Sequence, residues 1–236
     1  MSLSANRSGA VIFDLDGVLV DSEPLHVQAW KILFAQHGID ATEEEYAHGI
    51  GMRDAEWIQY LFERRGQETD PRWWQEAKRQ VFARILERHV RPFEGVPQLI
   101  ETLHPEFHLA VASNSWRENI QTVLRAMGVE ARFQALVGQE EVERHKPHPE
   151  AFLLAASRLG VPGPRCTVIE DSPLGIRAAR AAGMPCIGVA KTLPAAQLHE
   201  ADLVLASLAD PEPVVRFARM VVRRADQQRG GKRGSG

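Results

Sequence analysis

The chain has 236 residues, of which 44% are hydrophobic and 25% charged, and its formal net charge is −3. This composition is typical of a soluble globular protein, and the slight negative charge argues against nucleic acid or an anionic membrane as the main partner. No apolar run is long enough for a transmembrane helix, and the first nine residues lack the apolar core of a signal peptide. We therefore expect a cytoplasmic monomer. Its two cysteines, Cys166 and Cys186, are expected to be buried free thiols.

The first predicted element is a buried strand over Ala10–Asp14, because this run is apolar and rich in β-branched residues. From about Ser22 to His89 the apolar residues recur at helical spacing without a convincing strand. This block is inserted directly after the first strand, so a lid over the end of that strand is its expected role. We expect three tryptophans to belong to the core of the block: Trp57, Trp73 and Trp74.

After residue 90 the pattern changes, and predicted strands alternate with predicted helices. Such alternation indicates right-handed crossover units, a parallel sheet and helices on both of its faces. The expected fold class is therefore α/β, with a doubly wound, Rossmann-like core over 8–21 and 91–224, an all-helical cap domain over 22–90, and a disordered tail over 225–236. The predicted strands of the second part are 108–113, 135–138, 166–170, 186–190 and 202–205, and its predicted helices include 97–103, 149–159 and 173–182.

Polar side chains stand where these predicted strands end or where loops follow them. They are Asp14 and Asp16, Ser113 and Asn114, Lys146, and Glu170 and Asp171. Because parallel strands bring their carboxyl ends to one edge of the sheet, we expect these groups to converge. Four carboxylates there would repel one another unless a hard cation joined them, and oxygen ligands of this kind suit Mg²⁺, which commonly shares its coordination with a phosphate. The lysine and the serine hydroxyl complete a pocket for a phosphate dianion.

The spacing of the first two acids suits phosphoryl transfer. Asp14 and Asp16 are two residues apart in a loop, so both can reach one substrate. One can attack phosphorus while the other exchanges protons with the leaving oxygen and then with water. For Glu170 and Asp171, stabilisation of the following helix N-terminus is an alternative role that is compatible with metal binding.

Four stretches of the chain, in this order, resemble the four motifs of the haloacid dehalogenase superfamily of phosphotransferases. They are Asp14–His26, Val111–Ser115, His145–Phe152 and Val168–Gly183. The resemblance covers nearly the whole chain except its two ends, and the set is specific although each motif alone is not. It is strongest to the branch with a helical cap after the first motif, which holds β-phosphoglucomutase and many sugar-phosphate phosphatases.

The resemblance implies a role for each core position. Asp14 would be the nucleophile and Asp16 the general acid/base. Ser113 and Lys146 would hold the transferring phosphoryl group, and Gly17 would let the chain turn close to it. The implied magnesium ligands are Asp14, Asp16 through its backbone carbonyl, Asp171, and Glu170 directly or through water.

The resemblance also implies substrate contacts. In the cap, Gly49–Arg53 resembles the specificity loop of this branch, so Gly51 and Arg53 are expected to bind substrate, as is Asn114 in the core. His26 matches a position at the cap entry that positions the acid/base in the mutase relatives. The alternatives are an ion pair with a neighbouring acid for Arg53 and a packed structural role for His26.

The resulting hypothesis is a Mg²⁺-dependent phosphatase that acts on a small phosphorylated metabolite, expected to be a sugar phosphate, through an aspartyl-phosphate. A mutase of the β-phosphoglucomutase type remains an alternative, because it shares all four motifs. The mutase relatives carry a lysine in the cap loop, and Ala47–Arg53 has none, which favours hydrolysis. A regulatory phospho-acceptor module is an alternative from another class, although such modules are much shorter and need no lid.

Overall fold

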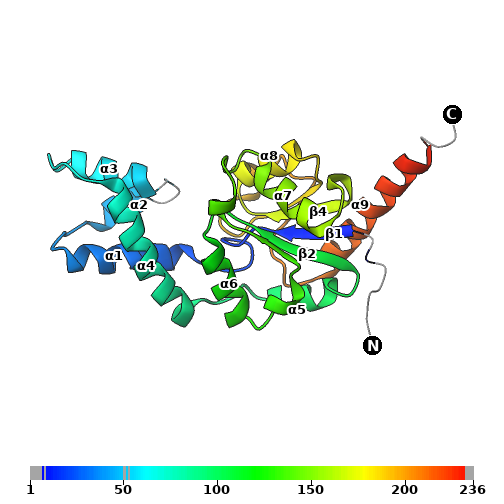
Figure 1. The fold of residues 1–236 in the computed structure, drawn as a ribbon, viewed down its shortest axis with the longest axis horizontal. Helices are drawn as coiled ribbons and strands as arrows, with labels where there is room; N and C mark the ends of the chain where they lie inside the picture. The colour runs from blue at the N-terminus through cyan, green and yellow to red at the C-terminus, as the bar shows by residue number, and fades with distance from the viewer. Residues whose placement is uncertain (1–6, 8, 50–51, 53, 232–236) are drawn as a thin grey trace. The chain divides into compact units, whose positions relative to one another are not determined.

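A parallel sheet forms the centre of the computed structural model, which describes residues 7, 9–49, 52 and 54–231. Its strands are β1 (Gly9–Phe13), β2 (Phe107–Ala112), β3 (Ala135–Val137), β4 (Cys166–Glu170), β5 (Cys186–Val189) and β6 (Leu203–Leu205). The strand order is β3-β2-β1-β4-β5-β6, and every recorded pairing is parallel (Figure 1). The predicted fold class is confirmed.

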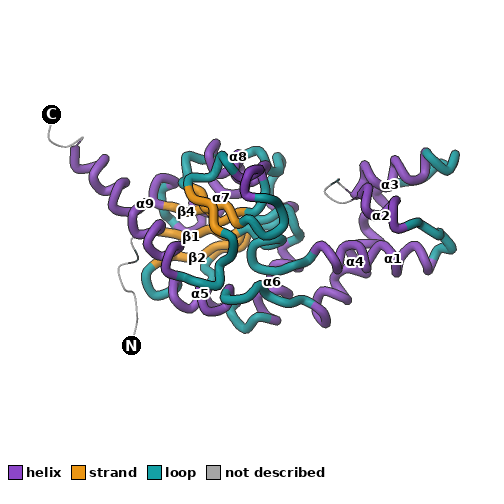
Figure 2. The backbone as a smooth tube through the Cα atoms, turned by 180° about the vertical axis from the view of Figure 1, so that it is seen from behind, coloured by secondary structure: helices purple, strands orange, loops and turns teal. Residues whose placement is uncertain are grey.

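Helices cover both faces of the sheet, as Figures 1 and 2 show from opposite sides. The helices of this part are α5 (Val96–Leu103), α6 (Arg117–Ala126), α7 (Glu150–Leu159), α8 (Pro173–Ala181) and α9 (Glu212–Gly231). On one face Ile12 of β1 shares a buried cluster with Phe152 of α7 and Ile176 of α8. On the other face α9 packs against β1 and β4, and Val222 reaches Gly9. Burial on both faces explains why β1 is apolar at every position.

Contacts divide the chain into two compact units, one within Met1–Asp21 and Arg91–Gly236 and the other within Ser22–Val90. The second unit is built of α1 (Glu23–Gln36), α2 (Glu43–Gly49), α3 (Asp54–Glu63) and α4 (Pro71–His89). Helix α4 begins after an N-cap residue, Asp70, whose side chain accepts a hydrogen bond from the Arg72 backbone at 3.0 Å.

Aromatic side chains make up the core of the Ser22–Val90 unit. The ring of Phe34 lies 5.7 Å from that of Trp57 and 5.4 Å from that of Trp74, and these tryptophans are buried as predicted. The prediction is wrong for Trp73, which is 46% exposed and meets His37 edge to face. Consecutive residues on a helix point in different directions, so Trp73 and Trp74 cannot share one buried position.

The C-terminal helix corrects the predicted tail. A disordered segment was expected over 225–236, but α9 continues to Gly231, and residues 232–236 lie outside the described part of the chain. Ala225 is buried, and Arg165 pairs with Asp226. The apolar residues of α9 recur at helical spacing, but the residues after Ala225 are polar or glycine, and this composition favoured a disordered tail.

Two smaller expectations concern the cysteines and the membrane. Cys166 and Cys186 are both free and buried, as predicted. Among the described residues there is no helix long and apolar enough to cross a membrane.

The buried sheet predicts a large difference between two leucine substitutions. Leu109 on β2 is fully buried, whereas Leu153 on α7 is 46% exposed. Leu109→Ala should lower the free energy of unfolding by about 2–5 kcal/mol, because it leaves a cavity between packed layers. Leu153→Ala should change it by no more than about 0.5 kcal/mol. Urea unfolding followed by circular dichroism measures both, and equal effects would contradict the assigned packing.

Candidate active site

The site lies where the strand order of the sheet reverses, between β1 and β4. Ligands of open α/β sheets bind beyond the carboxyl ends of strands at such a switch point. Phe13, the last residue of β1, is in register with Val111 of β2 and Ile169 of β4. The Asp14 backbone N–H continues this ladder by donating to the Ile169 carbonyl at 2.9 Å. The register therefore brings Asp14 next to Glu170.

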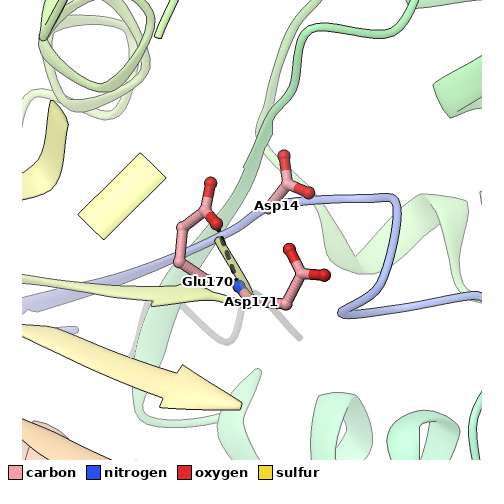
Figure 3. A group of neighbouring side chains, drawn as sticks. All are labelled: Asp14, Glu170 and Asp171. Atoms are coloured by element: carbon pink, nitrogen blue, oxygen red, sulfur yellow. Dashed lines mark hydrogen bonds between the residues drawn. The ribbon is translucent and has the colours of Figure 1, made fainter. Parts of the chain in front are cut away.

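Three carboxylates meet at this point. Asp14, Glu170 and Asp171 are each at most 8% exposed, and one oxygen from each lies within 4.8 Å of the others. Figure 3 shows how they come together: Asp14 follows the end of β1, and Glu170 and Asp171 stand at the end of β4. The predicted convergence of these acids at one edge of the sheet is what the structure displays.

One lysine enters the group from the loop before α7. Lys146 Nζ donates to Asp14 Oδ1 at 2.6 Å and to Glu170 Oε1 at 2.7 Å, and its side chain is only 4% exposed. The ammonium also lies 4.8 Å from the centre of the Phe152 ring. With three carboxylates and one lysine ionised, two negative charges stay uncompensated inside the protein.

Burial, together with the neighbouring charges, shifts the pKa values of this group. Burial raises the pKa of Asp14 well above its usual value; Lys146 opposes the shift, while Glu170, Asp16 and Asp171 increase it. Burial, with help from Glu170, raises the pKa of Asp171 to about 6. Burial by itself would lower the pKa of Lys146, but its two carboxylate partners hold that pKa above its ordinary value.

The donor set fits a magnesium ion. Mg²⁺ prefers oxygen ligands and is held in proteins by one or two carboxylates together with substrate oxygens. Asp14, Glu170 and Asp171 supply buried carboxylate oxygens, and their surplus charge is of the sign and size that a divalent cation neutralises. These three residues are the candidates to hold it.

Backbone and hydroxyl donors hold Glu170 at the start of α8. Its Oε2 accepts hydrogen bonds from the backbone N–H of Asp171, the backbone N–H of Ser172 and Ser172 Oγ, each at 2.9 Å. Helix α8 passes so close that a Cβ at Gly175 would overlap the Glu170 carboxylate. Glu170 therefore both approaches the other acids and stabilises a helix N-terminus, the two roles considered from sequence. The helix predicted over 173–182 contains Gly175, but no role was expected for this glycine from the sequence.

A serine that the sequence analysis did not single out orients Asp16. Ser115 Oγ donates to Asp16 Oδ2 at 2.6 Å. The same loop after β2 carries Ser113, which is 2% exposed and whose Oγ accepts from the Ser115 backbone at 3.1 Å. Asn114, between them, is exposed. Ser115 belongs to the quoted motif Val111–Ser115, so its place after a predicted strand was the available signal.

Position 17 requires a glycine because the Asp171 carboxylate lies against it. The φ of Gly17 is +78°, a conformation that favours glycine, and a Cβ there would overlap the Asp171 carboxyl group. From the sequence, Gly17 was expected to let the chain turn close to a phosphate. In the structure the close neighbour is a candidate metal ligand, so the glycine brings the Asp14–Gly17 loop against Asp171.

Comparison with known proteins identifies the family. Residues 11–189 match the family described as haloacid dehalogenase-like hydrolase, which is well over half of the chain. The chain belongs to this family.

Relatives among the haloacid dehalogenase-like hydrolases indicate which branch of the family this chain resembles. Fructose-1-phosphate phosphatase YqaB of Escherichia coli is 32% identical over 183 residues, covering 78% of this chain and 97% of that enzyme. A crystal structure of a putative β-phosphoglucomutase from Thermotoga maritima matches with a TM-score of 0.75 at 28% identity, covering 89% of this chain and 99% of that one. Family and relatives together support a phosphoric monoester hydrolase of the phosphatase branch.

A chloroplast protein of Arabidopsis thaliana, Suppressor of Quenching 1, is also similar to this chain. It is 35% identical over 205 residues, which are 83% of this chain but 19% of that protein. The likeness therefore covers one part of a much longer polypeptide.

The cap residues expected in this haloacid dehalogenase-like hydrolase have different outcomes. Gly51 and Arg53 lie outside the described residues. His26, within the Ser22–Val90 unit, stacks on Phe82 at 4.0 Å, and its Nδ1 accepts from Lys78 Nζ at 2.8 Å. This is the packed role considered as an alternative, and a substrate role for His26 remains a prediction.

Lys78 itself was missed by the sequence analysis. It is 6% exposed and also donates to Asp54 Oδ2 at 2.8 Å, so in the helical unit a buried lysine is paired with a carboxylate that is 34% exposed. A lysine among the apolar residues that recur at helical spacing before His89 was the signal that pointed to it.

The position of Gly17 makes a testable prediction. Gly17→Ala should lower hydrolysis of a phosphate monoester such as p-nitrophenyl phosphate by about 100-fold, because displacing reacting groups by about 1 Å has effects of that size. Gly183→Ala is the matched control, since Gly183 also has a positive φ, of +68°, but no neighbour within 4 Å of an added Cβ. Similar activity losses in the two variants would show that backbone strain, rather than contact with Asp171, explains the effect.

Proposed function

We propose that this chain hydrolyses the phosphate ester of a small metabolite, a sugar phosphate, with Mg²⁺ and through an aspartyl-phosphate on Asp14. The observation that carries the proposal is the buried group of Asp14, Lys146, Glu170 and Asp171 at the switch point of the sheet. Asp16 follows two residues after Asp14. The substrate class is supported by the fructose-1-phosphate phosphatase to which the chain is similar.

In the first half-reaction an Asp14 carboxylate oxygen attacks phosphorus, and the bond between phosphorus and the ester oxygen breaks. Asp16 gives its proton to that oxygen, which leaves as an alcohol. Ser115 holds the Asp16 carboxyl group in place for this transfer. Lys146, already in contact with Asp14, and Ser113 bind the phosphoryl oxygens and stabilise the charge on them.

In the second half-reaction Asp16, now a carboxylate, takes a proton from a water molecule while that water attacks phosphorus. The bond between phosphorus and Asp14 breaks, and inorganic phosphate and both starting carboxyl groups are regenerated. Asp16 thus serves both half-reactions, because it donates a proton in the first and accepts one in the second. The bound Mg²⁺ would neutralise the excess negative charge of the site and stabilise the transferring phosphoryl group.

The Ser22–Val90 unit is proposed to act as a cap that admits and selects substrate. Its two connections to the other unit run side by side: Val20 forms a bridge with Pro92, and the Phe93 backbone donates to the Leu19 carbonyl at 3.0 Å. The first connection is tied back to the site, because Gly17 N donates to Val20 O at 2.9 Å. Two adjacent connections at one point are the arrangement expected of a hinge.

A mutase is the second candidate, favoured by the similarity to the putative β-phosphoglucomutase. It would use the same core residues and return the phosphoryl group to a sugar instead of to water. With β-glucose 1-phosphate and a bisphosphate primer, a phosphatase releases inorganic phosphate, whereas a mutase forms glucose 6-phosphate. A panel of sugar phosphates, assayed for phosphate release, identifies the preferred substrate.

The nucleophile and the acid/base are expected to respond differently to substitution. Asp14→Asn should abolish turnover of every substrate. Asp16→Asn should slow hydrolysis of a sugar phosphate by about 10²–10⁴-fold, because the alkoxide then leaves without a proton. With p-nitrophenyl phosphate, whose leaving group needs no proton, the same variant should release a burst of nitrophenolate and retain phosphate on Asp14. Mass spectrometry of the quenched protein detects that adduct.

Controls distinguish these effects from loss of structure. Asp40→Asn, at an exposed position of the helical unit, should keep full activity. EDTA should stop hydrolysis by the wild type, and added Mg²⁺ should restore it. Full activity of Asp14→Asn, or of the EDTA-treated protein, would overturn the proposed mechanism. A phosphorylated wild type that persists without releasing phosphate would favour the phospho-acceptor alternative.

A further inference from the structure

Thr192 contacts the candidate metal site, and no role was expected for it from the sequence. It lies in the loop that follows β5, three residues after Val189 and at the same edge of the sheet as the site. Its Oγ1 donates a hydrogen bond to Asp171 Oδ2. Thr192 itself is exposed, whereas Asp171 is 8% exposed. A surface residue therefore holds a buried carboxylate.

Of the three buried acids, Glu170 accepts hydrogen bonds from the most donors. Glu170 accepts from Lys146, from two backbone N–H groups and from a serine hydroxyl, and Asp14 accepts from Lys146. In the described part of the chain, Thr192 is the donor recorded for the Asp171 side chain. Rotation of the Asp171 carboxylate thus depends on that hydroxyl.

The Gly17 backbone packs against both partners of this hydrogen bond. Gly17 approaches Asp171 so closely that a Cβ would overlap its carboxylate, and the same Cβ would lie 3.0 Å from Thr192 Cγ2. Gly17, Asp171 and Thr192 are therefore in mutual contact, and the Asp171 carboxylate is confined by both neighbours. Such partners of ligating carboxylates orient them, and their loss typically weakens metal binding by about 10- to 100-fold.

We propose that Thr192 is a positioning residue that sets the affinity of the site for Mg²⁺ by holding the Asp171 carboxylate through its hydroxyl. This inference rests on the proposed magnesium-dependent function. Thr192 does not touch the reacting atoms in the mechanism above, so its effect is expected on cation affinity and not on the rate of the loaded enzyme.

Isothermal titration of the full chain with Mg²⁺, without substrate, tests the proposal. Thr192→Val keeps the branched shape that packs on Gly17 but removes the donor, and it should raise the Kd for Mg²⁺ by about 10- to 100-fold. Thr192→Ser keeps the hydroxyl and should bind within about threefold of wild type, a difference of about 0.7 kcal/mol. Thr102→Val, the same change at an exposed position of α5, is the matched control and should bind as wild type does.

A kinetic readout accompanies the binding experiment. The Mg²⁺ concentration for half-maximal hydrolysis of p-nitrophenyl phosphate should rise in Thr192→Val in parallel with the Kd, while kcat at saturating Mg²⁺ stays close to wild type. Circular dichroism establishes that each variant is folded. Folding is expected, because Thr192 and Thr102 are both exposed.

The outcomes separate this inference from the function on which it rests. Wild type that binds Mg²⁺, with Thr192→Val binding equally well, would overturn the role of Thr192 and leave the phosphatase intact. Equal weakening in Thr192→Val and Thr192→Ser would also overturn it, because the methyl packing and not the hydroxyl would then matter. Wild type that binds no Mg²⁺ would overturn the proposed metal site itself.

Discussion

The structure depends on keeping several charges inside one protein core. Lys146 joins Asp14 to Glu170 in a pair of ionic hydrogen bonds almost wholly shielded from water. Breaking a buried pair of this kind from one side typically destabilises a protein by about 3–5 kcal/mol, because the remaining charge has no compensation. One lysine does not compensate three carboxylates, and the remaining negative charge is of the size that a divalent cation would neutralise.

Much of the surrounding architecture serves this group. The central position of β1 brings Asp14 to the switch point, and the N-terminus of α8 supplies backbone donors to Glu170. Glycines stand where side chains would collide with carboxylates, at Gly17 beside Asp171 and at Gly175 beside Glu170. A site that holds its charges with backbone dipoles and fixed neighbours needs little reorganisation when charge moves during phosphoryl transfer.

The core alone does not distinguish hydrolysis from phosphoryl transfer to a sugar. Proteins similar to this one include a phosphatase and a putative mutase, and one fold can support different activities. Under the cap role proposed for the Ser22–Val90 unit, the distinction depends on whether that unit admits water or a second hydroxyl. That unit has its own aromatic core, and its buried Lys78 makes hydrogen bonds with the partly exposed His26 and Asp54.

The sequence by itself determined the fold class and most of the acidic site. Strand ends are marked where an apolar run stops at a charged residue, as at Asp14 and at Glu170–Asp171, and parallel topology then brings those ends together. Only the tertiary structure decided which groups orient these acids. Ser115 is 99 residues from Asp16, and Thr192 is 21 residues from Asp171. Such hydrogen bonds depend on strand register and on the paths of separate loops, which no local pattern of residues encodes. For the same reason Trp73 and the last turns of α9 were misjudged, because burial on one face of a helix is decided by what packs against it.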